Sequence, residues 1–250
     1  MNMPLLYSST DGMTSRTLVE RAYAELRQHI VEGLLPPDEK LRVEHLKDKY
    51  QVGAGTLREA LTRLVSDSLV IAEGQRGFRV APMTLADLED ITRVRLHVEI
   101  EAVRLSIRHG DAAWKTRLRQ TFEAMHIISH PISPNQRMDY EKLNRAFHEV
   151  LTSGYHSPRT QQILSQLSRH GERYRRYTIS LQTIERNIHQ EHTDIYEAAI
   201  KGNETRAALA LETHIVSTVD LIRNAVNSGK NVFAKSPVIY NDESPIRASV

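Results

Sequence analysis

Hydrophobic positions near the start of the chain repeat with the period of a helix. From Thr14 onward, apolar residues recur on one helical face until Gly33 ends the pattern. The same spacing predicts a short helix over residues 43–50 and a third helix over about 56–67. A tight, glycine-containing link separates these two helices, so a helix-turn-helix is expected here.

The pattern then changes from a helical period to two short apolar runs, residues 69–72 and 78–80. Gly74 and Gly77 lie between the runs and supply a turn, which predicts a small β-hairpin. Helices followed by a hairpin in this order are typical of a winged helix-turn-helix. We therefore expect such a domain over residues 14–82.

Beyond residue 83 the chain has a helical period almost to residue 228, interrupted by glycines and prolines. This predicts an all-helical antiparallel bundle over 83–228, and a mostly α protein overall. We expect its helices at about 84–109, 111–129, 136–153, 159–181, 184–201 and 204–228. The polar ends, residues 1–13 and 229–250, are expected to be a disordered N-terminus and a flexible C-terminal tail.

The composition excludes several kinds of chemistry, but it does not by itself identify a binding partner. The 250 residues include no Cys, which excludes thiolate metal sites, disulfides and cysteine nucleophiles. The formal net charge of +2 does not by itself indicate nucleic acid, so a DNA-binding role depends on where the charges lie. No segment has the apolar length of a membrane helix, and we expect a cytoplasmic protein without a membrane partner.

Candidate DNA-binding residues gather on the third helix and on the hairpin. Side chains at the start of a recognition helix reach base edges and phosphates, which favours Thr56 and Arg58, with Arg63 further along. Arg42 precedes the helix-turn-helix and can hold a phosphate, whereas Arg76 and Gly77 form a slim wing turn. The alternative is a winged helix used only for protein contacts, with these cations as an ordinary solvated face.

Histidines are concentrated in the C-terminal part, where ten of the twelve lie. His148, His192 and His214 each fall inside an amphipathic helix beside its apolar stripe, and Asn144 lies one turn before His148. Imidazole is a common ligand of Zn and Ni, so three histidines with an oxygen donor suggest a divalent transition-metal site. Histidines in such places are also often ordinary core residues, and the spacing does not show that these three meet.

The N-terminal residues resemble the DNA-binding domain of GntR-family bacterial transcription regulators. The resemblance lies in the runs PDEKLR at 37–42, LREAL at 57–61 and GFRV at 77–80. The family motif VSR-x-PVREAL has two arginines that contact DNA. Arg58 matches the second arginine, but the first falls on Ala54, so the resemblance implies DNA binding without indicating the operator sequence.

Residues 84–228 resemble the FCD domain, the helical ligand-binding domain of FadR-type members of that family. Many FCD domains bind a divalent metal through an Asp and three His; here His148, His192 and His214 match the histidines, and Asn144 replaces the Asp. The resemblance also implies a small carboxylate effector, held at the metal and by an arginine of the first helix, which matches Arg95. Arg173, on a middle helix, is a second effector-binding candidate, although a solvated basic face is an equal alternative.

Together these features predict a homodimeric, effector-responsive transcription regulator that binds double-stranded DNA at a palindromic operator, and a repressor rather than an activator. Within the family the glycine-flanked third helix and the Asn-for-Asp exchange are most similar to CsiR-like regulators. Two alternatives stay open: a regulator whose effector is the metal ion itself, and a metal-dependent hydrolase fused to a DNA-binding module. We expect no enzymatic activity, because no carboxylate stands in a recognisable base motif.

Overall fold

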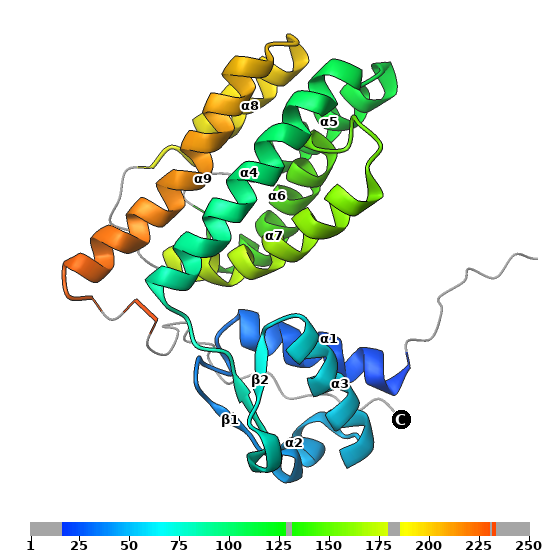
Figure 1. Ribbon diagram of the computed structural model, residues 1–250, viewed down its shortest axis with the longest axis vertical. Coiled ribbons are helices and arrows are strands. Elements are labelled where there is room, and N and C mark those ends of the chain that lie inside the picture. The colour runs from blue at the N-terminus through cyan, green and yellow to red at the C-terminus, as the bar shows by residue number, and fades with distance from the viewer. Residues whose placement is uncertain (1–16, 129–131, 180–185, 231, 234–250) are drawn as a thin grey trace, which may run out of the picture.

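Three helices and a small sheet make up the N-terminal domain in the computed structural model (Figure 1), which describes residues 17–128, 132–179, 186–230 and 232–233. The elements are α1 (Leu18–Val31), β1 (Lys40–Leu41), α2 (Val43–Tyr50), α3 (Ala54–Ser66), β2 (Val70–Ala72), the short 3-10 helix η1 (Gly74–Arg76) and β3 (Phe78–Val80). Their apolar faces enclose one core that includes Leu26, Leu57, Leu61 and Val80. The predicted winged helix-turn-helix is confirmed.

Local chemistry explains where these helices begin and end. Thr17 and Glu20 form a reciprocal capping box, in which each side chain accepts a hydrogen bond from the other's backbone N–H, at 3.2 and 2.9 Å. Gly33 follows α1 with a φ of 77°, a left-handed conformation that favours glycine. Helix α3 begins at Ala54, two residues before the prediction, because the extended backbone of Gly53 serves as its N-cap.

The sheet has one strand more than the sequence pattern indicates. Its order is β1-β3-β2 and both pairings are antiparallel, with Lys40 opposite Arg79 and Val70 opposite Val80. β1 has only two residues, too few for an alternating pattern to be recognised. β1 pairs with the edge of β3 that β2 leaves open, so β3 has a hydrogen-bonded strand on each side.

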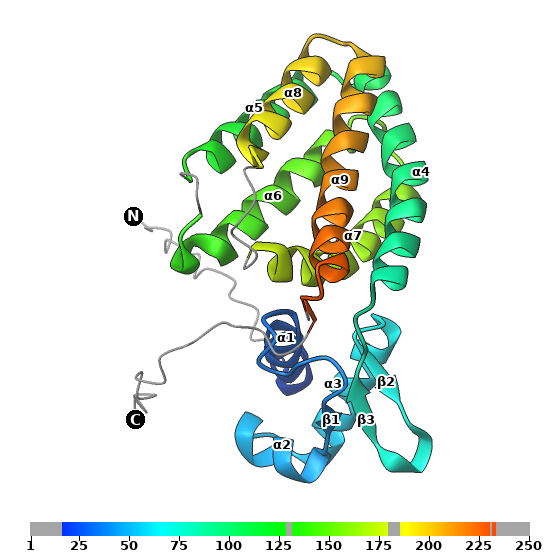
Figure 2. The same ribbon diagram turned by 90° about the vertical axis from the view of Figure 1, so that its left-hand side faces the viewer.

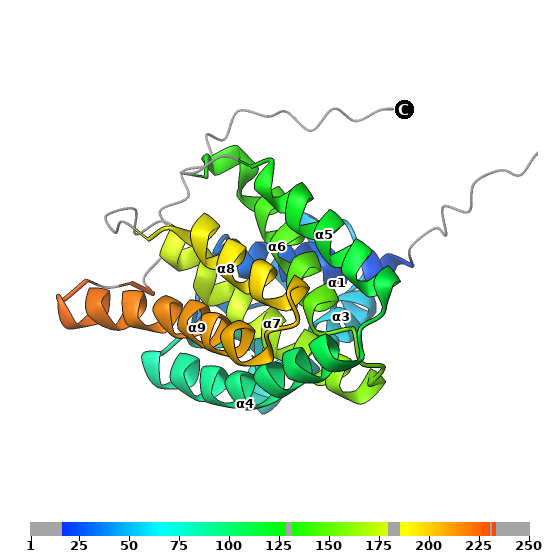
Figure 3. The ribbon, with the colours of Figure 1, turned by 90° about the horizontal axis from the view of Figure 1, so that it is seen from above.

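The C-terminal domain is an all-helical bundle, as predicted. Its helices are α4 (Leu85–His109), α5 (Ala112–His126), α6 (Arg137–Leu151), α7 (Pro158–Ile179), α8 (Ile188–Ile200) and α9 (Glu204–Asn227), with a 3-10 turn η2 (Pro134–Gln136) before α6. Helix α9 packs between α4 and α8, and α5 packs against α6 (Figures 2 and 3). Trp114, Leu118, Phe147 and Leu151 are fully buried in its core.

Asparagine, threonine and aspartate caps set most of the helix starts in the bundle. The side chains of Thr84, Asp111, Asn187 and Asn203 each accept a backbone hydrogen bond from the first turn of the following helix. Asn187 thus starts α8 at residue 188, four residues after the predicted start. No helix in the described part of the chain is both long and apolar enough to cross a membrane.

The predicted ends of the chain are described only in part. The predicted disordered segment 1–13 and residues 234–250 of the predicted tail lie outside the described residues. Before that, Val232 is buried and the ring of Phe233 meets the ring of Tyr174 edge-on at 5.7 Å. Val232 and Phe233, near the start of the predicted tail, thus pack onto the bundle.

Candidate metal centre

Three helices of the bundle bring three histidines to one buried point. His148 comes from α6, His192 from α8 and His214 from α9, and their side chains are 8%, 1% and 7% exposed. One ring nitrogen of each lies within 4.8 Å of the others, and the ring centroids are 4.5–5.7 Å apart. These are the three histidines chosen from the sequence, and the structure brings them together.

In each of the three rings, Nδ1 forms a hydrogen bond to a group outside the histidine cluster. His148 Nδ1 donates to Glu99 Oε1 at 3.0 Å, and His214 Nδ1 donates to Glu191 Oε2 at 2.7 Å. His192 Nδ1 donates to the backbone carbonyl of Ile188 at 2.9 Å. In proteins that bind metals through histidine, such an outer partner fixes the tautomer and leaves Nε2 for the ion.

Burial keeps these imidazoles in the neutral form that a metal requires. Burial lowers the pKa of His148 despite the nearby Glu99 carboxylate, and lowers the pKa values of His192 and His214 well below the usual range. For Glu99 burial alone would raise the pKa, but the Arg95 guanidinium and the His148 N–H together lower it to about 2. The site thus combines neutral imidazoles with an ionised carboxylate.

Within the described residues, one inward-facing nitrogen has no hydrogen-bond partner and a second faces an amide oxygen. Nε2 of His148 is buried and is the one without a partner. His192 Nε2 lies 2.9 Å from Asn144 Oδ1, while its Nδ1 faces the Ile188 carbonyl. A neutral imidazole has one N–H and cannot donate to both oxygens, so either the Asn144 amide is turned or a cation lies between nitrogen and oxygen. These residues therefore fit a divalent metal with nitrogen and amide-oxygen ligands.

Two arginines line a small cavity beside the histidines. Arg95 binds Glu99 through Nε and Nη2, at 2.5 and 3.3 Å, and Arg175 binds Glu141 through the same two atoms, at 3.3 and 3.1 Å. The cavity measures about 20 Å³, and its wall includes both arginines together with Asn144, His148, His214 and Thr218. Arg95, a candidate from the sequence, thus lies in the same cavity wall as His148 and His214.

Arg175, Glu99 and Glu191 were not among the residues chosen from the sequence. The Arg95–Glu99 pair has the i, i+4 spacing of a helical ion pair, a signal that was present in the sequence. Nothing in the local pattern identifies Arg175 or Glu191, because their partners lie on other helices or beyond a turn.

Arg173 does not reach the histidines. Its Nη2 donates to the carbonyl of Ala81, at 2.8 Å, in the link between the domains. Its neighbours on α7 are also engaged at this junction. Glu172 accepts from Arg27 of α1 at 3.1 Å and from Arg145 of α6 at 3.2 Å, and Tyr174 donates to Asp87 at 2.6 Å. Neighbouring residues of α7 thus contact the DNA-binding domain, the link and the cavity beside the histidines.

The candidate DNA-binding residues lie on α3, at the start of α2 and at the wing turn, elements of the domain drawn below the bundle in Figures 1 and 2. Arg58 is exposed in the first turns of α3 and Thr56 is half-buried beside it, whereas Arg63 is exposed and pairs with Glu59 at 2.8 Å. Arg42 is exposed at the start of α2. At the wing, Arg76 is exposed and Gly77 has a φ of 94°, a conformation that L side chains rarely adopt.

Comparison with known proteins decides the family. Residues 18–80 match the model of bacterial regulatory proteins of the gntR family, and residues 90–217 match that of the FCD domain. This chain belongs to the GntR family. The GntR-family chain is 38% identical over 213 residues to the HTH-type transcriptional regulator BphR of Paraburkholderia xenovorans, covering 83% of this chain and 86% of the relative.

A second relative of this GntR-family protein is named as a repressor. The HTH-type transcriptional repressor GlaR of Escherichia coli is 30% identical over 213 residues, which cover 82% of this chain and 95% of GlaR. Among solved structures, a putative GntR regulator from Rhodococcus has the same fold, with a TM-score of 0.66 at 21% identity over 83% of this chain and 98% of its own. The protein is thus a transcriptional regulator of a DNA-binding family, as the resemblance implied.

Proposed function

We propose that this protein is a homodimeric repressor whose affinity for a palindromic operator is controlled by a small carboxylate bound at a divalent metal. The observation that supports the proposal most directly is the convergence of His148, His192 and His214 in a chain with a winged helix-turn-helix. Asn144 completes the candidate ligand set. The ion, Zn or Ni by ligand type, would supply a Lewis-acid centre for an anionic oxygen.

On the DNA side, two copies would present their α3 helices to successive major grooves, with half-sites about one helical turn apart. Arg58 and Thr56 are the proposed base-reading residues, and Arg63 lies further along the same helix. Arg42 is proposed to hold a phosphate, and Arg76 with Gly77 to form the wing contact. Ala54 offers no cation, so direct base readout in the first turns of α3 would depend on Thr56 and Arg58.

On the effector side, charge balance favours an anion that arrives with the metal. Arg95 and Arg175 are already paired with Glu99 and Glu141, so the residues of the pocket are close to neutral by themselves. The ligands we propose are uncharged, since Asn144 replaces an acid and the histidines are held neutral by burial. A bound divalent ion would therefore keep its full charge, which attracts a carboxylate.

Helix α7 is the element that we propose to couple the pocket to the DNA-binding domain. Arg175 lines the cavity, while Glu172, three residues earlier, binds Arg27 of the DNA-binding domain. A ligand shifts a conformational equilibrium only through different contacts in the two states. An effector that draws Arg175 or Arg95 from its glutamate changes the position of α7, and with it the junction.

The test measures operator affinity in three ligand states. An operator is first selected from random DNA by rounds of binding, because its sequence is not implied by the protein. Fluorescence anisotropy then gives the dissociation constant for chelator-treated protein, for protein with Zn²⁺ or Ni²⁺, and for metal-loaded protein with a panel of mono- and dicarboxylates. We expect one carboxylate to weaken operator binding by about 5- to 150-fold, only in the presence of metal.

Variants separate the parts of the proposal. H148A/H214A should lose bound metal by elemental analysis and lose the carboxylate response, and full metal content in this variant would refute the site. R95A should keep operator binding but lose the carboxylate response. Because Arg95 also holds Glu99, the partner of His148 Nδ1, the response is measured at a Zn²⁺ concentration that saturates the variant. If metal alone changes operator affinity and no carboxylate adds to it, the protein is a metal sensor and the carboxylate proposal is wrong.

A further inference from the structure

Two of the three histidines are supported by the same sequence of groups. His148 donates to Glu99, which Arg95 binds through two nitrogens; His214 donates to Glu191, which Arg186 also binds through two nitrogens. His192 differs, since its Nδ1 partner is a backbone carbonyl. The site therefore contains two arginine–glutamate–histidine chains that approach it from different helices.

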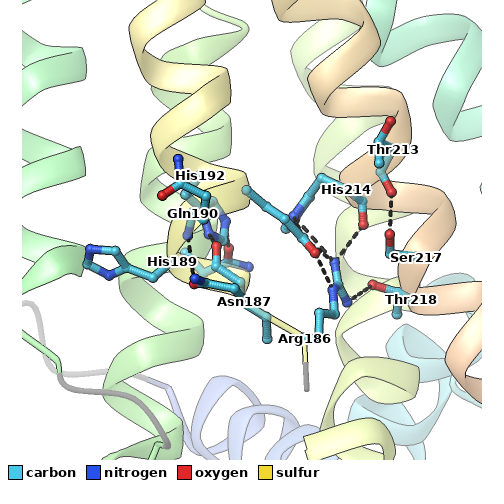
Figure 4. A network of polar contacts seen from close by, with 12 residues as sticks. Arg186, Asn187, His189, Gln190, His192, Thr213, His214, Ser217 and Thr218 are labelled. Atoms are coloured by element: carbon cyan, nitrogen blue, oxygen red, sulfur yellow. Dashed lines mark hydrogen bonds and ion pairs between the residues drawn. The ribbon is translucent and has the colours of Figure 1, made fainter. Parts of the chain in front are cut away.

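In the group that contains Arg186, every guanidinium nitrogen has a hydrogen-bond partner within the protein. Arg186 precedes α8, and its Nε and Nη2 bind the two oxygens of Glu191 at 2.8 and 2.6 Å. Its Nη2 also donates to the carbonyl of His214 at 2.7 Å, and its Nη1 donates to Thr218 Oγ1 at 2.9 Å. Figure 4 shows the guanidinium between the start of α8 and the side of α9 that bears His214 and Thr218. All three nitrogens are occupied.

The chain through Arg95 is different, because it borders the pocket. Arg95 lies in the wall of the small cavity, whereas Arg186 does not. Within the described residues, Arg95 makes hydrogen bonds only to Glu99, through Nε and Nη2, and its Nη1 makes none. Arg95 therefore has a nitrogen left for a ligand, and Arg186 has none.

We propose that Arg186 is a positioning residue of the metal centre, which holds Glu191 and thereby directs Nε2 of His214 toward the ion. This inference rests on the proposed function and adds a division of roles: the Arg186 chain is permanent, and the Arg95 chain is the one that an anion can open. The physical basis is that a carboxylate on Nδ1 fixes the tautomer and makes the opposite nitrogen a stronger ligand. A bidentate guanidinium in turn fixes the carboxylate, which a single-point cation does less well.

The experiment measures metal affinity rather than transcriptional response. Zn²⁺ or Ni²⁺ alone is titrated into metal-free full-length protein in competition with a chromophoric chelator. R186Q should weaken metal binding by about 10- to 100-fold. R186K, which keeps a cation beside Glu191, should recover part of the loss. The matched control is R223Q, on the exposed end of α9, where Arg223 pairs with Glu89 and Asp220; its metal affinity should equal that of the unmodified protein.

A double substitution tests whether Arg186 acts through Glu191. E191A removes the acceptor of His214 Nδ1 and should weaken metal binding at least as much as R186Q. If Arg186 works only by holding Glu191, then R186Q/E191A binds metal no more weakly than E191A alone. Circular dichroism and thermal unfolding of the metal-free variants show whether the fold is kept, and R186K serves as the test if R186Q unfolds.

The outcomes separate this inference from the proposed function. If the unmodified protein binds no metal, the proposed function fails first. If it binds metal and R186Q binds equally well, the metal centre stands and the role of Arg186 is refuted. Additive losses in R186Q/E191A would also overturn the inference, because they would assign Arg186 an effect independent of Glu191.

Discussion

The residues around the three histidines are organised by what occupies the second nitrogen of each ring. Glu99 and Glu191 are charged acceptors and the Ile188 carbonyl is a neutral one, so the three imidazoles are unequal donors. Phe147 packs edge-on against both His148 and His192, with ring centroids 5.5 Å apart, and keeps water from that side. The apolar ring of Phe147 thus covers one side of the histidine cluster.

Arg58 supplies the prediction that belongs to this scale. R58A should weaken operator binding by about 5- to 150-fold, because a bidentate arginine–guanine contact contributes roughly 1–3 kcal/mol of discrimination. Fluorescence anisotropy with the selected operator measures the change. R119A, which removes an exposed arginine of α5 in the bundle, should bind like the unmodified protein. Equal affinity of R58A and R119A would remove Arg58 from the recognition surface.

At the residue scale the sequence indicated the three histidines, but not most of the residues that hydrogen-bond to their Nδ1 atoms or hold those partners in place. His148, His192 and His214 could be chosen because each stands beside an apolar stripe within its own helix, and the family resemblance matched them. Arg186 and Glu191 act across the gap between α8 and α9, which no periodicity encodes. The sequence pattern does not separate Arg173 from Arg175, because both are arginines of one helix. The rotation of α7 about its axis decides which of them faces the cavity, and the structure places Arg175 there.

At the scale of elements, side-chain caps and glycines determine the bundle more than propensity does. The helical period with its breaks predicted every helix of the bundle to within about four residues, because each break contains a strong turn former. The strand β1 escaped prediction, since its two residues become a strand only by pairing with β3. Gly154 marks a close approach of two backbone segments, and Gly110 leaves room for the ring of Trp114.

Gly154 provides the stability prediction. A Cβ at this position would lie 2.4 Å from the carbonyl oxygen of Ser106 and 2.9 Å from its Cα, backbone atoms that cannot move aside easily. G154A should therefore destabilise the bundle by about 1–3 kcal/mol, seen as a lower thermal midpoint. The matched variant is G55A in α3, where a Cβ meets nothing within 4 Å and alanine should leave stability unchanged or raise it. A G154A midpoint equal to that of G55A would contradict the close approach.

At the scale of the whole molecule, one buried carboxylate joins the two domains. Glu172 is 2% exposed and accepts hydrogen bonds from Arg27 of the DNA-binding domain and Arg145 of the bundle. Beside it, residues of α3, β2, the link between the domains, α4 and α7 frame an open cleft of about 810 Å³, lined by Ile71, Ile163, Arg169 and Tyr174 among others. The domains therefore meet through a few directed contacts with space next to them, an arrangement that can change without unfolding either domain.

Glu172→Gln is the variant that tests this junction. The substitution leaves both arginines with a neutral amide in place of their shared carboxylate, so the coupling between effector and operator should fall toward onefold. Anisotropy with and without the active carboxylate measures the coupling, and metal content should stay unchanged. E204Q, which breaks the surface pair of Arg108 and Glu204 within the bundle, is the control and should keep full coupling. Retained coupling in E172Q would assign the transmission to another contact.

The small size of the cavity beside the histidines has a consequence for timing. A volume of about 20 Å³ admits one particle the size of water, so the proposed carboxylate would enter only after Arg95 or Arg175 has moved. At high effector concentration the rate of entry then reaches a ceiling set by the protein's own opening. Release would require the same opening. A repressor of the proposed kind would therefore respond to the sustained presence of its effector and average over brief fluctuations.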